Sequence, residues 1–310
     1  MSIDTVPTAG PGATAPPPAI SGPEPAPPAG RTAGGLARAI GHHVAEVARQ
    51  PVLLLAWAVV LVAIGWALAP GLFTSHSPYQ GDPSASFAPP SGEHWFGTDR
   101  LGRDLYARSV YGAATTLSAT LLAVLIAFGV GTVVGLAAGF SGGFVDTAIM
   151  RVVDVFLAIP SLLLAMVVVS VLGYSTHNIA IAVGISSIAS FARVMRSEVI
   201  GVVTRDYVRA AYGLGVGRWR VVRTHVVPNS LSSVVALAAL EVGAAILAVA
   251  SLGFLGYGAP PPEPEWGLLV AEGRDFIAVH PWTSLLPGAA LAVVVIATHR
   301  ISTSLRKDLG

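Results

Sequence analysis

Residues 139–143 read Gly-Phe-Ser-Gly-Gly and match the Gly-x-Ser-x-Gly pattern that carries the nucleophile of many serine hydrolases. That chemistry requires a strand before the serine turn, together with histidine and aspartate partners. The residues before this pattern are instead a long uncharged run, which predicts a membrane-spanning helix. We therefore do not expect Ser141 to be a catalytic nucleophile.

Other kinds of reactive or ligating site are also poorly represented in the sequence. The chain has no cysteine, which excludes disulfides, thiolate nucleophiles, iron–sulfur clusters and zinc-thiolate sites. No Gly-x4-Gly-Lys-Ser/Thr run occurs, so we expect no P-loop for ATP. Five of the eight histidines, namely His42, His43, His76, His177 and His280, have no ligand-like spacing among themselves. The sequence predicts a chain that is not an enzyme and that itself binds neither a metal nor a cofactor.

The composition is that of a protein whose main solvent is lipid. Of the 310 residues, 53% are hydrophobic and only 11% are charged, whereas soluble domains carry about 25% charged residues. The formal net charge of +1 gives no basic field for a nucleic acid. The placement of the charges is therefore more informative than their sum.

Apolar stretches predict six membrane-spanning helices, and so an all-α polytopic fold. A helix needs about 20 apolar residues to cross the hydrocarbon core. The uncharged run 155–192 is too long for one helix, and a turn is expected at residues 173–178. The stripe Gly131, Gly135 and Gly139 suits close helix contact in lipid. The helices are expected at about residues 52–69, 115–138, 155–172, 179–191, 231–254 and 282–298.

The chain divides into regions by composition. Residues 1–35 are rich in Pro, Ala and Gly and predict a disordered tail. The first apolar run starts only at Val52, so we expect it to be a retained anchor rather than a secretory signal. The other regions are 36–114 with the first helix and a loop, 115–303 with helices two to six and a polar segment at 193–229, and 304–310.

The distribution of basic residues predicts the orientation. Six spans place both termini on one side of the membrane. Of the 18 basic residues, only Arg100, Arg103, Arg108 and Arg274 fall on the opposite side. Basic residues are enriched in cytoplasmic loops, so both termini should be cytoplasmic.

The polar segment 193–229 is much longer than a connection between spans requires. Its small residues Ala210, Ala211 and Gly215 predict a face that another protein's backbone could approach closely. The neighbouring arginines could pair with acidic residues of that protein. On length and composition alone, a loop that is basic only because of membrane topology stays an equal alternative.

The same segment resembles the Glu-Ala-Ala loop of ABC importer permeases, in which a coupling helix sits in a groove of the ATP-hydrolysing subunit. Ala210, Ala211 and Gly215 match that motif, Val227-Pro228 stands for the usual Leu-Pro, and Arg209 replaces the leading Glu. The resemblance implies coupling to an ATPase subunit through Asp206, Tyr207, Arg209, Ala210, Ala211, Gly215, Trp219 and Pro228.

Residues 94–104 resemble the His-Trp-Leu-Gly-Thr-Asp-x-x-Gly-Arg-Asp signature of the dipeptide, oligopeptide and nickel branch of these permeases. Residues 140–154 and 252–267 resemble two further loops of that branch, so the likeness covers roughly residues 50–310. The signature residues are Gly97, Thr98, Asp99, Gly102, Arg103 and Asp104. Their spacing suits local charge pairs and helix caps, so we expect a structural role ahead of contact with a solute-binding protein.

Glu241 is expected near the middle of the fifth span. An ionisable side chain at that depth normally faces a cavity or a partner. Two roles stay open for Glu241, namely lining a solute path and forming a hydrogen bond to a second membrane subunit.

The resemblance implies a type I ABC importer permease fold in the bacterial inner (cytoplasmic) membrane. It further implies a homologous second permease subunit, two subunits that bind ATP and Mg²⁺, and an extracytoplasmic solute-binding protein. Di- or oligopeptides are the leading substrate class, with nickel or another small solute as the alternative. A secondary transporter would usually show inverted repeats with broken helices, which we do not detect.

Overall fold

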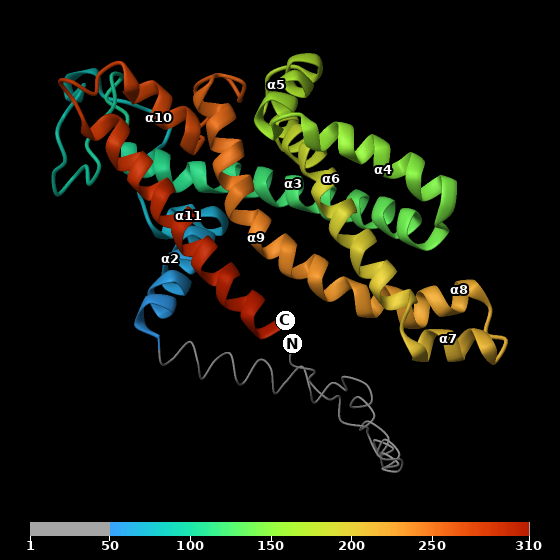
Figure 1. Ribbon diagram of the computed structural model, residues 1–310. Coiled ribbons are helices and arrows are strands. Elements are labelled where there is room, and N and C mark those ends of the chain that lie inside the picture. Colours follow the sequence, from blue (N-terminus) through green and yellow to red (C-terminus); the bar gives the residue numbers. More distant parts are fainter. Residues whose placement is uncertain (1–49, 310) are drawn as a thin grey trace, which may run out of the picture. The chain divides into compact units, whose positions relative to one another are not determined.

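The computed structural model describes residues 50–309, with side chains through Leu305, so the predicted tail at residues 1–35 lies outside the described residues. Within this range the chain is helical, without any strand longer than an isolated bridge (Figure 1). The helices are α2 (Pro51–Leu68), α3 (Leu105–Ser141), α4 (Gly143–Ala158), α5 (Ser161–Leu172), α6 (Thr176–Val203), α7 (Asp206–Gly213), α8 (Arg218–Val221), α9 (Val227–Phe254), α10 (Trp266–Arg274) and α11 (Trp282–Leu309). Short turns are η1 (Pro70–Leu72), η2 (Pro83–Ala85) and the π-helical η3 (Val222–Val226).

The described residues contain five helical segments long and apolar enough to cross a bilayer, formed by α2, α3, α6, the run from α8 through α9, and α11. A sixth candidate span is the pair α4 and α5, which is bent by 95° at a short break. The chain is thus an all-α polytopic membrane protein, with six spans when the bent pair counts as one.

The bent pair differs from the continuous helix predicted at residues 155–172. The break falls at Ile159-Pro160, where Ile159 is extended and Pro160 precedes the first residue of α5. Proline disfavours helical backbone in the residue before it and cannot donate a hydrogen bond, so the helix ends there. Residues 155–158 therefore belong to α4, which begins at Gly143.

Several helices are longer than predicted and contain charged residues, including α11, which continues to Leu309 rather than ending near residue 298. α6 continues to Val203 rather than ending near residue 191. Arg193 pairs with Asp154 of α4, and Arg196 makes a two-pronged pair with Asp146, with N–O distances of 2.5 and 2.7 Å. Because each arginine has a carboxylate partner on a neighbouring helix, neither charge ends α6. α3 likewise begins at Leu105 rather than near residue 115.

The glycine stripe of α3 makes the close helix contact predicted from its spacing, and its neighbour is α6. A Cβ atom on Gly131 would lie 2.4 Å from the Cβ of Phe191, and one on Gly135 would lie 2.4 Å from the carbonyl oxygen of Ala192. Both distances are far below normal contact, so only glycine permits this approach. Dispersion contacts between closely packed backbones are the main attraction between helices in lipid.

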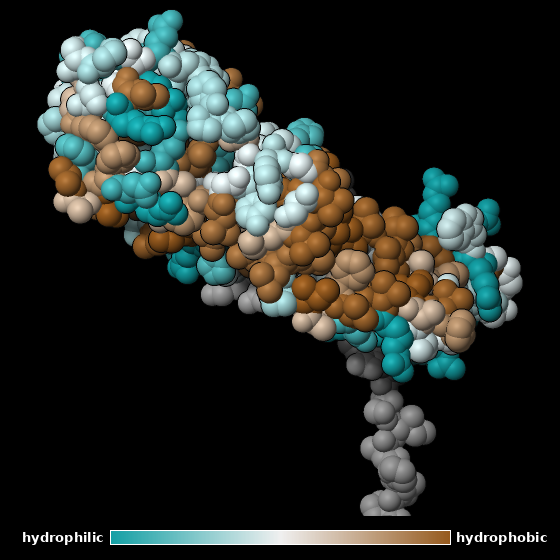
Figure 2. Space-filling model, turned by 90° about the horizontal axis from the view of Figure 1, so that it is seen from above, coloured by the Kyte–Doolittle hydropathy of each residue, from teal (hydrophilic) through white to brown (hydrophobic). Residues whose placement is uncertain are grey.

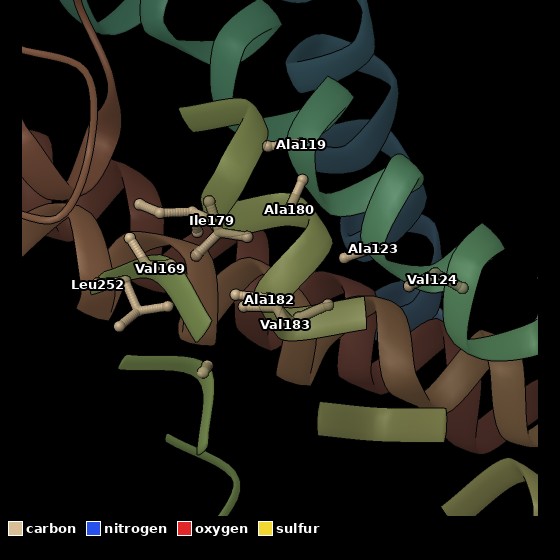
Figure 3. Close-up of a cluster of buried hydrophobic side chains, with 12 residues drawn as sticks. Ala119, Ala123, Val124, Val169, Ile179, Ala180, Ala182, Val183 and Leu252 are labelled. Carbon is tan, nitrogen blue, oxygen red and sulfur yellow. The ribbon is translucent and has the colours of Figure 1, made fainter. Parts of the chain in front are cut away.

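The buried core follows the contacts of α6 with its neighbours. One cluster of small and β-branched side chains joins α3, α5, α6 and α9 (Figure 3). A second cluster, nearer to α7, includes Phe191, Met195 and Val234. Figure 2 shows an apolar surface over the spanning helices, with polar side chains gathered toward the two ends. We call these the loop end (residues 69–104 and 255–281) and the short-helix end (α7 and α8).

Candidate functional site

Asp99 organises the signature turn at the loop end. One of its carboxylate oxygens, Oδ1, accepts hydrogen bonds from the backbone N–H groups of Leu101 (2.8 Å) and Arg103 (3.0 Å). The other, Oδ2, accepts from Nε of Arg103 at 2.6 Å. Asp99 and Arg103 are both buried. A buried charge is stable only when it is paired and hydrogen-bonded, and here each partner satisfies the other.

Arg108 extends this network to two distant segments. Its guanidinium group is fully buried, and Nη2 donates to Oε2 of Glu272 on α10 at 2.9 Å. Nη1 donates to the carbonyl oxygens of Pro78 (3.2 Å) and Pro262 (3.4 Å). One arginine therefore joins the loop after α2, the start of α3 and the loop after α9.

Sequence reasoning missed this pair: it counted Arg108 only as a basic residue outside the membrane and did not consider Glu272. Arg103 Nη2 also lies 3.5 Å from Oε2 of Glu272, so this carboxylate serves two arginines. Arg108 and Glu272 are 164 residues apart in the sequence, so no local pattern indicates that they are in contact. The one available signal was an arginine placed where a spanning helix begins.

The other signature residues fix the backbone around this network. Asp104 is the N-cap of α3, accepting from the N–H of Ala107 at 2.6 Å, and its second oxygen lies 2.8 Å from Nδ1 of His94. Thr98 donates to the carbonyl of Ala85 at 2.5 Å and accepts from the N–H of Ala88 at 2.7 Å.

Gly97 and Gly102 have φ angles of +72° and +74°, in the region that favours glycine. The backbone at both glycines lies close to residues 82–88 of the loop after α2. A Cβ on Gly102 would lie 1.8 Å from the carbonyl oxygen of Asp82. All six signature positions are thus used inside the chain, which favours the structural role over direct contact with a partner.

Glu265 is a further buried carboxylate at the loop end and was not singled out from the sequence. It caps α10 by accepting from the N–H groups of Gly267 and Leu268, both at 2.9 Å, and from Thr116 Oγ1 at 3.2 Å. Burial raises the pKa of this carboxyl group, while the hydrogen bonds from its own helix oppose that shift. Glu265 holds α10 against α3.

At the opposite end, α7 presents two distinct faces. Val208 and Ala211 are buried against the chain's own core, whereas Arg209 and Ala210 are exposed. Residues three apart share a helix face, which explains why the buried pair lies inward together. This arrangement corrects the predicted small-residue face, because Ala211 packs inside the chain and only Ala210 and Gly215 stay available to a partner.

Gly215 ends α7. Its φ is +78°, its N–H donates to the carbonyl of Tyr212 at 3.0 Å, and the N–H of Val216 donates to the carbonyl of Ala211 at 3.1 Å. These two bonds form a Schellman motif, which needs a left-handed residue at this position. A Cβ added to Gly215 would point into open space. Glycine is required here by backbone conformation and not by crowding within the chain.

Two large apolar side chains stand out from this end. Leu214 is 84% exposed and Trp219 is 79% exposed. Sequence reasoning included Trp219 but missed Leu214. The rings of Tyr207 and His225 pack edge to face, with centroids 6.1 Å apart. Asp206 is exposed at the start of α7. Around them lie exposed arginines, namely Arg205, Arg209, Arg218, Arg220 and Arg223. The surface combines apolar anchors with positive charge.

Pro228 lies where the short helices join the long one. α8 continues through η3 into α9, and Pro228 occupies the first turn of α9. A proline lacks the N–H for the usual helical bond, and η3 takes up the mismatch with a wider π-helical turn. Asn229 Nδ2 donates to the carbonyl of His225 at 2.6 Å, which ties the first turn of α9 to η3. Movement of α8 should therefore reach α9.

Glu241 lies midway along α9 and is half-buried. Ser187 of α6 donates to its Oε1 at 2.6 Å. The bond joins the two helices that flank α7 and α8, at the level between the two apolar clusters. Ser187 was not identified from the sequence, which offered no signal for this pairing.

We expect Ser187→Ala to lower the free energy of unfolding by about 0.6 kcal/mol, and by no more than about 1.7 kcal/mol, as for other hydrogen bonds between membrane helices. Reversible unfolding in detergent micelles measures the change. The matched control is Ser186→Ala, because the Ser186 hydroxyl donates to the Val183 carbonyl of its own helix. Equal effects of the two substitutions would show that the bond to Glu241 adds no stability between helices.

Comparison with known proteins agrees with this arrangement of helices. Residues 131–309 match the family described as "Binding-protein-dependent transport system inner membrane component". The chain is 42% identical over 257 residues to the dipeptide transport system permease protein of Alkalihalophilus pseudofirmus, covering 83% of each chain. It is 38% identical over 248 residues to a probable D,D-dipeptide transport system permease protein of Escherichia coli, covering 80% of this chain and 83% of the relative. It is 38% identical over 220 residues to the glutathione transport system permease protein of Pectobacterium atrosepticum, covering 71% and 73%.

Solved structures show the same fold at lower identity. A chain of an amino acid ABC transporter superposes with a TM-score of 0.51 at 16% identity, covering 64% of this chain and 92% of that chain. A chain of the MetNI methionine ABC transporter in an inward-facing conformation gives 0.50 at 18% identity, covering 65% and 97%. With its family match over residues 131–309 and its relatives at 38–42% identity, the chain belongs to the family of inner membrane components of binding-protein-dependent transport systems.

Proposed function

We propose that this chain is a permease subunit of an ATP-driven importer and forms half of the translocation path for di- or oligopeptides. The observation that carries the proposal is the 42% identity over 83% of the chain to a permease named for dipeptide transport. Other relatives are named for D,D-dipeptides and for glutathione, which are also short peptides. Nickel or another small solute is the alternative cargo of the same transporter class.

The proposed complex contains a homologous second permease, two ATPase subunits and an extracytoplasmic solute-binding protein. ATP and Mg²⁺ are bound by the ATPase subunits, and hydrolysis takes place there. One ATPase subunit docks on the short-helix end, where Leu214 and Trp219 offer apolar anchors within basic surroundings. The arginines of α7 and α8 are among the basic residues that the positive-inside rule assigns to the cytoplasm, so we place this end on the cytoplasmic side. The same rule assigns both termini to that side.

The continuity of the helices suggests how docking is coupled to the path. α6 leads into α7 after a short turn, and α8 runs through η3 into α9. α7 and α8 therefore connect two spanning helices that also share the Ser187–Glu241 bond. When the ATPase subunits close, displacement of α7 should move α6 and α9 together and alternate the access to the path.

Replacing Gly215 tests the shape of the docking segment. Gly215→Val should reduce ATP-dependent uptake at least several-fold, because left-handed backbone costs a residue with a Cβ about 1–2 kcal/mol and a β-branched residue more. Gly215→Asn should keep most of the uptake, because asparagine tolerates this conformation. Uptake by membrane vesicles with matched amounts of the chain measures both.

Gly217→Ala is the control for that experiment, since Gly217 has a φ of −60° and a Cβ added there would meet open space. Wild-type uptake by the Gly215→Val variant would contradict the proposed role of the α7 terminus.

Purification of the tagged chain from its host in a mild detergent tests the proposed complex. We expect mass spectrometry to find a second permease and P-loop ATPases in the preparation. Vesicles containing that complex and its binding protein should accumulate dialanine only when ATP is present. Recovery of the chain alone, under conditions that preserve other ABC complexes, would overturn the proposal.

A further inference from the structure

We propose that a groove at the loop end, between α3, the start of α6 and the loop after α9, binds the charged termini of a short peptide on its way to the translocation path. This inference rests on the proposed function and names a site for its substrate. The groove would hold the peptide's carboxylate at the N-terminus of α6 and its ammonium group at Glu263.

The groove has a volume of about 500 Å³. Pockets that enclose small organic ligands range from about 300 to 1,000 Å³, so the groove is large enough for a dipeptide. Two of the segments that line the groove contact each other, since the rings of Tyr174 before α6 and Tyr257 after α9 have centroids 5.6 Å apart. The lining residues are Thr115, Ser118, Ala119, Leu122, Ser175, Thr176, His177, Ala259 and Glu263.

Thr176 carries the first part of the argument. It is 8% exposed, and its buried hydroxyl group has no hydrogen-bond partner within residues 50–309. Thr176 is the first residue of α6, so its hydroxyl group has no earlier carbonyl of the same helix to donate to. The carbonyls of Leu172 and Gly173, which precede α6, accept from Nδ2 of Asn178, at 3.0 and 2.9 Å, and not from Thr176. The Thr176 hydroxyl is therefore available to a ligand.

The backbone at the same place offers further donors. Ser175 caps α6 by accepting from the N–H of Asn178 at 3.1 Å. The N–H groups of Thr176 and His177 occupy the first two helical positions, which have no acceptor within a helix. Together with the positive end of the helix dipole, these donors favour a carboxylate. The exposed His177 side chain adds a ring N–H donor at this position.

Glu263 supplies the opposite charge. Its side chain is exposed on the loop after α9 and forms no ion pair or side-chain hydrogen bond within the described range. The neighbouring Glu265 is fully occupied as the cap of α10. Glu263 is thus the carboxylate of this loop that is available to a ligand, and an ammonium group is its natural partner.

A free dipeptide matches both ends of the groove, with apolar Ala119 and Leu122 beside its side chains. Acetylating the amino end removes the charge that pairs with Glu263. Converting the carboxyl end to an amide removes the charge that pairs with the start of α6. A free dipeptide should therefore bind at least tenfold more tightly than either blocked form.

Photolabelling of the complete transporter in lipid nanodiscs tests the site. A dipeptide of photo-leucine and alanine should label residues of α3 or of the loop after α9 that line the groove. Dialanine should displace the label at least tenfold more effectively than N-acetyl-dialanine or dialanine amide. Glu263→Gln should abolish the preference over the acetylated form, and Thr176→Val should reduce the preference over the amide.

Two matched variants control for general damage to the transporter. Glu93→Gln removes another exposed carboxylate at the loop end, and Thr147→Val removes an exposed hydroxyl of α4. Both should keep the wild-type pattern of displacement. Labelling outside the groove, or equal displacement by free and blocked dipeptides, would overturn the site. Continued dialanine uptake by the same complex would then leave the proposed function standing, whereas a wild-type complex that takes up no peptide would overturn both.

Discussion

Replacing Arg108 with glutamine should leave little correctly folded chain in the membrane. The guanidinium group of Arg108 is fully buried and bonds to Glu272 and to the carbonyls of Pro78 and Pro262. Without Arg108, the Glu272 carboxylate would keep only its longer contact with Arg103, at 3.5 Å. Removing one partner of a buried ion pair costs about 3–5 kcal/mol. That is a large part of the roughly 5–15 kcal/mol by which a typical protein is stable.

The amount of protease-resistant chain and its melting temperature in detergent measure this loss. Arg274→Gln is the matched control, because Arg274 lies at the same end in an exposed pair with Asp275 at 3.3 Å. Exposed pairs contribute about 0–1 kcal/mol, so this variant should behave as the wild type. Adding Glu272→Gln to Arg108→Gln should recover part of the stability, because it removes the carboxylate that has lost its 2.9 Å bond to Arg108. An Arg108→Gln variant that melts with the wild type would contradict the role of the network.

The spanning helices were largely predictable because apolar length is a strong local signal. The bounds of α2, the end of α9 at Phe254 and the close contact of the α3 glycines with another helix followed from sequence alone. The errors in the helix bounds arose where a residue has a partner far away in the sequence. Arg193 and Arg196 were expected to lie beyond the end of a span, but carboxylates of α4 allow α6 to continue.

The candidate sites were predictable to different degrees. The signature glycines and Asp104 act locally, through turns and a helix cap, and spacing was enough to indicate such roles. The bonds of Arg108 with Glu272 and of Ser187 with Glu241 join segments far apart in the chain. The inward direction of Ala211 likewise depends on which face of α7 packs on the core.

Trp219→Ala should weaken docking of the ATPase subunit about 30-fold. A tryptophan at the centre of an interface typically contributes about 2 kcal/mol or more, and each 1.4 kcal/mol or so corresponds to a tenfold change in affinity. In the described residues of this chain Trp219 is 79% exposed, far more than a tryptophan without a partner would favour. Burying the indole ring against a second protein accounts for this exposure.

Titration of purified ATPase subunits onto nanodiscs that hold both permeases measures the affinity. Tyr174→Ala is the control, because this tyrosine is 63% exposed but lies at the loop end. The arginines around Trp219 contribute a separate, long-range attraction that salt screens. The affinity of the Trp219→Ala complex should therefore fall with ionic strength as steeply as that of the wild type, from a lower starting value. If alanine at position 219 leaves the affinity unchanged, the short-helix end cannot dock through this side chain, and the arginines alone would have to hold the ATPase subunit.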